Sequence, residues 1–81
     1  MILHVSTDDG DVEIHEHALA TITEADLKKL RMSRDDLYRC FAEGLRLMEE
    51  SEVKPADRVR PFAERTLDGE WEVHLVRYSP N

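Results

Sequence analysis

The sequence predicts an α+β fold, a β-β-α-α-β-β two-layer sandwich with two helices packed on one face of a four-stranded, mostly antiparallel sheet. Near each end of the chain, two runs of alternating apolar and polar residues flank an Asp-Gly pair, which predicts two hairpins. Between them, apolar residues recur with helical spacing over residues 34–50. Strands at both ends with helices between them form two layers around one core.

The first hairpin is predicted at residues 2–17. Its Asp9-Gly10 pair suits the positive φ angles of a two-residue type I′ turn. With this pair in the turn, Val5 faces Ile14 and His4 faces His15. We prefer this register to a three-residue loop, which would mix core and solvent side chains on each face.

Two helices are predicted at residues 24–31 and 34–50, and both begin with a capping box. Thr23 can cap the first helix while Asp26 reaches back, and Ser33 and Asp36 repeat this arrangement for the second. The apolar arc of the second helix contains Leu37, Phe41, Gly44, Leu45 and Met48. The glycine in this arc predicts a close approach of the helix to its neighbour, at about 1 kcal/mol of lost helix propensity.

The second hairpin is predicted at residues 59–78, with Asp68-Gly69 in a two-residue turn. This register pairs Phe62 with Leu75 on the helix side of the sheet and Ala63 with His74 on the open side. Because Pro61 lacks a backbone N–H, we expect the strand that contains it to lie at a sheet edge.

Length and composition predict a single domain over residues 1–81 that is acidic and cytoplasmic. Its net charge is −7, and residues 1–20 carry five Asp and Glu but no Lys or Arg. Nucleic acid and anionic lipid need a basic surface, so a basic protein partner or a cation fits this end better. The single cysteine, Cys40, cannot form an internal disulfide, and no leader-like or membrane-spanning segment is expected.

A metal site on the open face of the sheet is one hypothesis for the histidines. His4 and His15 are expected opposite each other, with His17 on the same face and His74 on the last strand. Imidazoles, with or without carboxylates, bind zinc, nickel and copper. The alternative is a set of unliganded surface histidines or a cluster that responds to pH.

The two helices also resemble a helix-turn-helix, with a short turn at residues 31–33. Charge argues against DNA binding, because Asp35 and Asp36 would approach phosphates at the start of the second helix. The turn also lacks the glycine often found in this motif. A plain helical hairpin is therefore the preferred interpretation.

No nucleophile elbow, Gly-rich phosphate loop or cysteine pair is present in the sequence, so we do not expect an enzyme. The leading hypothesis is a small acidic regulatory or interaction protein. It would bind a protein partner through its open sheet face or acidic N-terminal hairpin, and a homodimer through that face is also considered. The residues predicted to contact a partner are Ile2, Glu13, Val59, Val76 and Tyr78. Ala63 is expected on the same open face.

Overall fold

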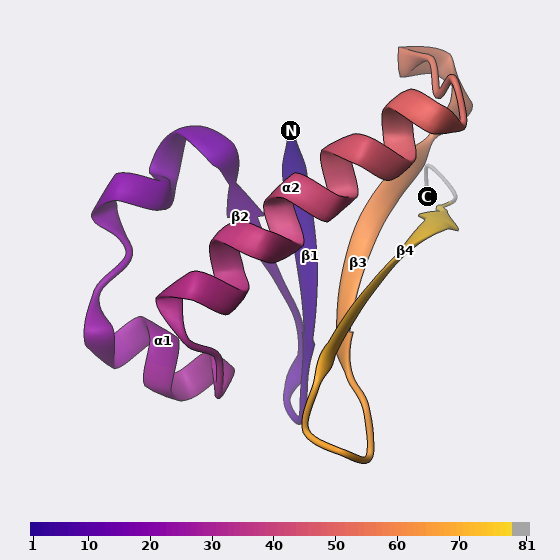
Figure 1. The fold of residues 1–81 in the computed structure, drawn as a ribbon. Coiled ribbons are helices and arrows are strands. Elements are labelled where there is room, and N and C mark those ends of the chain that lie inside the picture. Colours follow the sequence, from indigo (N-terminus) through magenta and orange to yellow (C-terminus); the bar gives the residue numbers. More distant parts are fainter. Residues whose placement is uncertain (79–81) are drawn as a thin grey trace.

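The structure, a computed structural model that describes residues 1–78, has the predicted order of strands and helices (Figure 1). The four strands and two α-helices are β1 (Ile2–Thr7), β2 (Gly10–His15), α1 (Glu24–Leu30), α2 (Arg34–Glu50), β3 (Val59–Arg65) and β4 (Trp71–Arg77). Two short 3₁₀ helices, η1 (Glu16–Thr21) and η2 (Pro55–Asp57), were not predicted. Because η1 begins at Glu16, the first hairpin ends at His15 and not at residue 17.

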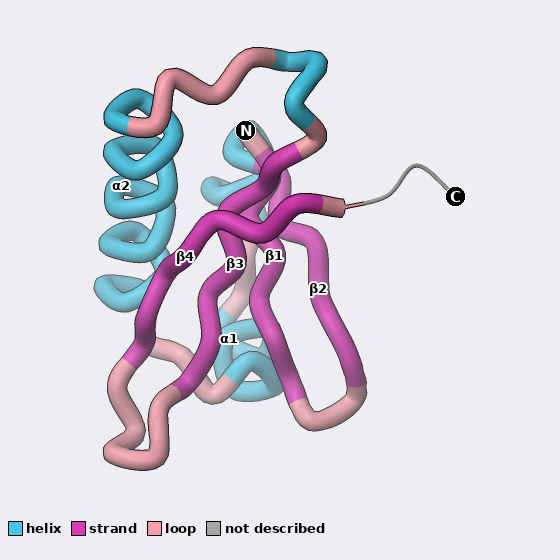
Figure 2. Tube along the Cα trace, turned by 90° about the vertical axis from the view of Figure 1, so that its right-hand side faces the viewer, coloured by secondary structure: helices cyan, strands magenta, loops and turns pink. Residues whose placement is uncertain are grey.

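The strands form a mixed four-stranded sheet in the order β2-β1-β3-β4. The two hairpins are antiparallel, and they join through a parallel pairing of β1 with β3. In Figure 2, α1 lies behind the strands and α2 stands beside β4, while no α-helix lies in front of the sheet. The helices therefore cover one face and leave the other uncovered. The prediction that β3 is an edge strand is wrong, because β3 lies between β1 and β4.

Pro61 fits inside the sheet because the pairing of β1 with β3 starts after it. The first paired residues are His4 and Phe62, and the second are Val5 and Ala63. The missing N–H of Pro61 therefore lies at the start of this ladder and interrupts no pair within it. Its ring is almost completely buried under α2.

The first hairpin keeps its predicted facing but not its predicted register. Leu3 pairs with Ile14, and Val5 pairs with Val12, because the turn is Asp8-Asp9 and not Asp9-Gly10. The shift is two residues, and since side chains alternate with a period of two, it moves no side chain to the other face. Leu3 and Val5 of β1 still point at the helices.

The register of the second hairpin differs from the prediction by one residue. The side chains of β3 therefore point to the opposite faces of the sheet from those predicted. Thr66 donates its N–H to the Glu70 carbonyl (2.8 Å), so the loop contains three residues and ends at Gly69, whose φ is +84°. A three-residue loop with a left-handed glycine in third place is a common hairpin connection. Ala63 therefore pairs with Val73 on the helix side, and Phe62 with His74 on the open side.

The core lies between the sheet and the helix layer. Buried side chains come from both hairpins, both helices and the turn between the helices: Leu3, Val5, Ile14, Leu27, Leu30, Met32, Leu37, Cys40, Phe41 and Ala63. Trp71 and Val73 of β4 pack against it with part of their surface exposed. Leu45, predicted in the buried arc of α2, is 38% exposed.

Both predicted capping boxes are present. Thr23 donates its backbone N–H and its hydroxyl to the Asp26 carboxylate (3.0 and 2.9 Å), and these hydrogen bonds lower the pKa of Asp26. Ser33 and Asp36 form the second box. A lowered carboxyl pKa stabilises the fold above the pKa of the unfolded chain, and this contribution is lost as the pH falls through the folded value.

The close approach predicted at Gly44 is confirmed, and Pro61 is the neighbour. A methyl group built on Gly44 would lie 3.0 Å from Cβ and 3.2 Å from Cγ of the proline. The proline ring is buried and stiff, so it cannot move aside as the end of a long side chain would. Gly44 therefore fixes how closely α2 lies on the middle of the sheet. Within residues 1–78, no helix is both long and apolar enough to cross a membrane.

We predict that Gly44→Ala lowers the free energy of unfolding by about 1 kcal/mol, because overpacking against Pro61 exceeds the gain of about 1 kcal/mol in helix propensity. Urea unfolding followed by circular dichroism measures the change. Ala42→Gly, at an exposed position of the same helix, is the matched control and should lose only helix propensity. A Gly44→Ala variant that is more stable than the wild type would contradict the account.

Candidate functional site

The uncovered face of the sheet is the candidate functional site. On each strand, the residues that alternate with the buried ones point to this side. We call it the open face, and its residues are Ile2, His4 and Ser6 of β1, Asp11, Glu13 and His15 of β2, Arg60, Phe62 and Glu64 of β3, and Glu72, His74 and Val76 of β4.

The centre of the open face is an aromatic stack that joins the two hairpins. The rings of His4 and Phe62 lie 4.5 Å apart between centroids and only 18° from parallel. Beside them, the Arg60 guanidinium lies over the Tyr78 ring, 4.7 Å from its centre. Nη1 of Arg60 is also 3.4 Å from Nε2 of His4. These contacts fix flat and partly exposed side chains in the middle of the sheet.

His4 is enclosed by these neighbours. A guanidinium can only donate, so a hydrogen bond between Arg60 and His4 needs an Nε2 that carries no proton. Nδ1 is buried and has no hydrogen-bond partner among the described residues. The side chain is 13% exposed, and the carboxylate of Glu13 lies 3.8 Å from Nε2. His4 therefore belongs to the packing of the open face more than to a free metal-binding surface.

The prediction that His4 pairs with His15 across the first hairpin is wrong, although both residues stay on the open face. His4 pairs with Glu13 in the observed register, and His15 pairs with Ile2. The His15 ring instead lies near His17 of η1, with 5.3 Å between centroids.

His74 is on the open face, as predicted, but it binds a neighbouring carboxylate. Its Nε2 lies 3.2 Å from Glu64, and Phe62 stands between it and His4. Among residues 1–78, no three His, Cys, Asp or Glu side chains are arranged to hold a metal ion. Metal binding by His4, His15, His17 and His74 therefore stays a prediction that the geometry does not favour.

Carboxylates surround the aromatic centre. Asp11 and Glu13 lie on one edge strand, Glu72 lies on the other, and Glu64 lies between them on β3. Arg60 is the one Lys or Arg at the twelve positions of the open face, and its guanidinium is occupied by Tyr78 and His4. With neutral histidines, these positions carry a net negative charge.

Three of the five residues predicted to contact a partner lie at open-face positions: Ile2, Glu13 and Val76. Tyr78 follows β4 and packs on Arg60 from the same side. Val59 alternates with the buried Pro61 and Ala63 along β3, so it points to the helix side of the sheet. The prediction that Val59 and Ala63 lie on the open face is therefore wrong. The predictions missed Phe62 and Arg60, because the one-residue shift of the second hairpin exchanges the faces of β3.

The start of α2 is poorly suited to DNA. The Arg34 guanidinium turns back and donates to the Ile22 carbonyl (3.0 Å) and the Glu24 carboxylate (3.1 Å). Asp36 belongs to the capping box of α2, and Asp35 is exposed beside it. Arg34, the basic residue of the first turn of α2, is therefore already paired. The two carboxylates lie where DNA phosphates would approach.

Cys40 is buried in the core, with 2% of its surface exposed. Burial raises the pKa of the Cys40 thiol to about 11, which keeps it protonated and unreactive at neutral pH.

Comparison of the chain with protein-family models, with curated proteins and with solved structures gives no match. The open face is therefore interpreted from its own chemistry.

We predict that the stability of the fold declines between about pH 9 and pH 11 because of Cys40. An unfolded thiol ionises near 9.0, whereas the folded thiol retains its proton up to about 11, so rising pH favours the unfolded chain across this interval. Urea unfolding at a series of pH values measures the decline. The Cys40→Ala variant should lack the part of the slope that the thiol contributes, and equal slopes for the two proteins would contradict the prediction.

Proposed function

We propose that the chain is a small acidic interaction or regulatory protein, without catalysis of its own, that binds a basic protein. The contact is made by the open face and by the acidic edge strand β2 that continues it. The observation that carries the proposal is the arrangement of this face, an ordered aromatic and apolar centre with carboxylates around it.

The centre of the open face has the composition of an interface core. Aromatic residues and arginine are enriched in such cores, where they bury large area at a small entropic cost. Phe62 and the Arg60–Tyr78 pair are already held in place by their neighbours. A partner that covers them therefore has little side-chain freedom left to restrict.

The charge around this centre selects the partner. Asp11, Glu13, Glu64 and Glu72 give the face a negative potential, which attracts a basic surface and speeds its encounter. A second copy placed face to face would bring like charges together, so a homodimer through this face is disfavoured. A basic partner that normally binds nucleic acid would find carboxylates where phosphates would otherwise lie, which is one way the chain could inhibit it.

The fold provides no observation among the described residues that supports the metal-binding hypothesis or the DNA-binding hypothesis. Metal binding lacks a gathered set of ligands within the described residues. DNA binding lacks a free base at the start of α2. The cytoplasm is the compartment we propose, since the buried Cys40 is a free thiol.

We predict that the immobilised chain captures basic proteins from a cell extract at low salt and releases them as salt is raised. The double variant Glu13→Lys, Glu72→Lys, which reverses two carboxylates on the open face, should lose them. The double variant Glu49→Lys, Glu52→Lys is the matched control, because it makes the same charge change at exposed positions near the end of α2. Mass spectrometry identifies what each protein retains.

Two results would contradict the proposed function. One is the recovery of the same proteins by both double variants, because the open face would then contribute nothing. The other is a captured set that is no more basic than the extract, because the carboxylates would then select nothing.

A further inference from the structure

From the free edge of β2 we infer that the partner contributes an extended segment of alternating basic and apolar residues, which adds to the sheet as a fifth strand. This inference rests on the proposed function and specifies the partner's chemistry. Three observations on β2 carry it: the direction of its backbone groups, the groove beside it and the charge on its other side.

The first observation is the hydrogen-bond pattern of the first hairpin. Glu16 donates its N–H to the Met1 carbonyl (3.0 Å), which makes these two residues a hydrogen-bonded pair. In an antiparallel ladder, hydrogen-bonded and non-hydrogen-bonded pairs alternate. The backbone N–H and C=O of Asp11, Glu13 and His15 therefore point away from β1.

No strand within residues 1–78 pairs with this side of β2, which is the end of the sheet. In Figure 2, no helix or strand flanks β2 on its outer side. The free groups are thus available to an added strand, and six residues of β2 provide the template.

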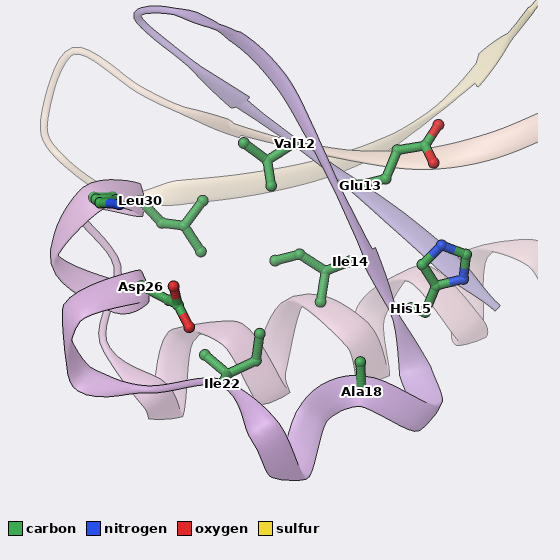
Figure 3. Close-up of a pocket in the computed structure, with 9 residues that line it drawn as sticks. Val12, Glu13, Ile14, His15, Ala18, Ile22, Asp26 and Leu30 are labelled. Carbon is green, nitrogen blue, oxygen red and sulfur yellow. The ribbon is translucent and has the colours of Figure 1, made fainter.

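The second observation is an apolar groove under β2. It has a volume of about 300 Å³ and lies between β2, η1 and α1. Val12 and Ile14 point into it toward Ala18, Ile22 and Leu30, as Figure 3 shows. Val12 is 41% exposed, so the helix layer leaves part of this strand uncovered. Apolar side chains of an added strand, next to Val12 and Ile14, would extend over this groove.

The third observation is the charge on the other side of the same strand. Asp11 and Glu13 alternate with Val12 and Ile14, and their carboxylates lie on the open face. The side chains of an added strand that lie next to them point to the same face, where Lys or Arg is the complementary choice. The alternation of acidic and apolar side chains on β2 thus specifies an alternation of basic and apolar side chains on the added strand.

The same carboxylates disfavour pairing of β2 with a second copy. Antiparallel pairing of two β2 strands about Glu13 would place the two glutamates directly opposite each other, and charges on edge strands are a known protection against such pairing. The edge of β4 differs, since its open-face residues include a single acid, Glu72. We therefore place the added strand on β2.

The test uses a seven-residue peptide that alternates Lys and Val, with blocked ends, and the full chain labelled with ¹⁵N. We expect the peptide to shift the amide signals of Asp11, Glu13 and His15 and to slow their hydrogen exchange. Asp11→Lys should weaken binding about tenfold or more, because it replaces an attraction with a repulsion. Glu72→Lys, the matched control on β4, should weaken it much less.

Methylated peptides test strand addition itself. In an antiparallel fifth strand, the Lys residues opposite Asp11 and Glu13 direct their N–H groups at β2, and the Val N–H groups point away. N-methylation of the Lys amides should therefore abolish binding, while N-methylation of the Val amides should preserve it. Equal binding of the two methylated peptides would overturn the inference, and so would equal loss in the two charge variants.

The failure of this inference can be told apart from the failure of the proposed function. If the peptide shifts the signals of Phe62 and Val76 but leaves hydrogen exchange in β2 unchanged, a basic ligand binds the face and strand addition is wrong. If the peptide does not bind at millimolar concentration and no basic protein is captured, both are wrong.

Discussion

The pairing of Leu3 with Ile14 and of Val5 with Val12 is the constraint on which the rest of the structure depends. Leu3, Val5 and Ile14 are buried under the helix layer, so their side of the hairpin becomes the inner face of the sheet. The alternation of the strand then leaves the carboxylates of Asp11 and Glu13 outside. The same register sets which backbone groups of β2 point away from the sheet. Core, surface charge and free edge are thus three consequences of one pairing.

The parallel pairing of β1 with β3 joins this hairpin to the second one and creates the centre of the open face. It brings His4 beside Phe62, and the Arg60 and His4 side chains meet across 56 positions of the chain. On the other side of the same strand, the contact of Gly44 with Pro61 seats α2 on the sheet. A single strand, β3, therefore carries contacts to the core on one face and the aromatic stack on the other.

The sequence was sufficient to predict the four strands, the two α-helices and both α-helix caps, because their signals are local. The capping boxes at Thr23 and Ser33 each involve residues three positions apart, and the close packing at Gly44 followed from a glycine in an apolar arc. The register was harder. A shift of two residues in the first hairpin leaves every side chain on its face, so periodicity alone cannot distinguish Asp8-Asp9 from Asp9-Gly10 as the turn.

The candidate site was predicted less well, because it depends on contacts between distant segments. The facing of β3 depended on whether Gly69 ends a two-residue or a three-residue loop, and both types accept glycine there. The wrong choice moved Phe62 to the helix side and Ala63 to the open side. No feature of the sequence indicated that β3 lies beside β1. Pro61 instead suggested that β3 is an edge strand of the sheet. The open face itself was predicted, but its aromatic centre was not.

Amide hydrogen exchange of the isolated chain, resolved residue by residue by NMR, tests the central constraint most directly. The observed register predicts protected amides at Val12 and Ile14 and fast exchange at Asp11, Glu13 and His15, because only the first group faces β1. Protection of Asp11 and Glu13 with fast exchange at Val12 and Ile14 would contradict the register. It would remove both the free edge of β2 and the partner strand inferred from it.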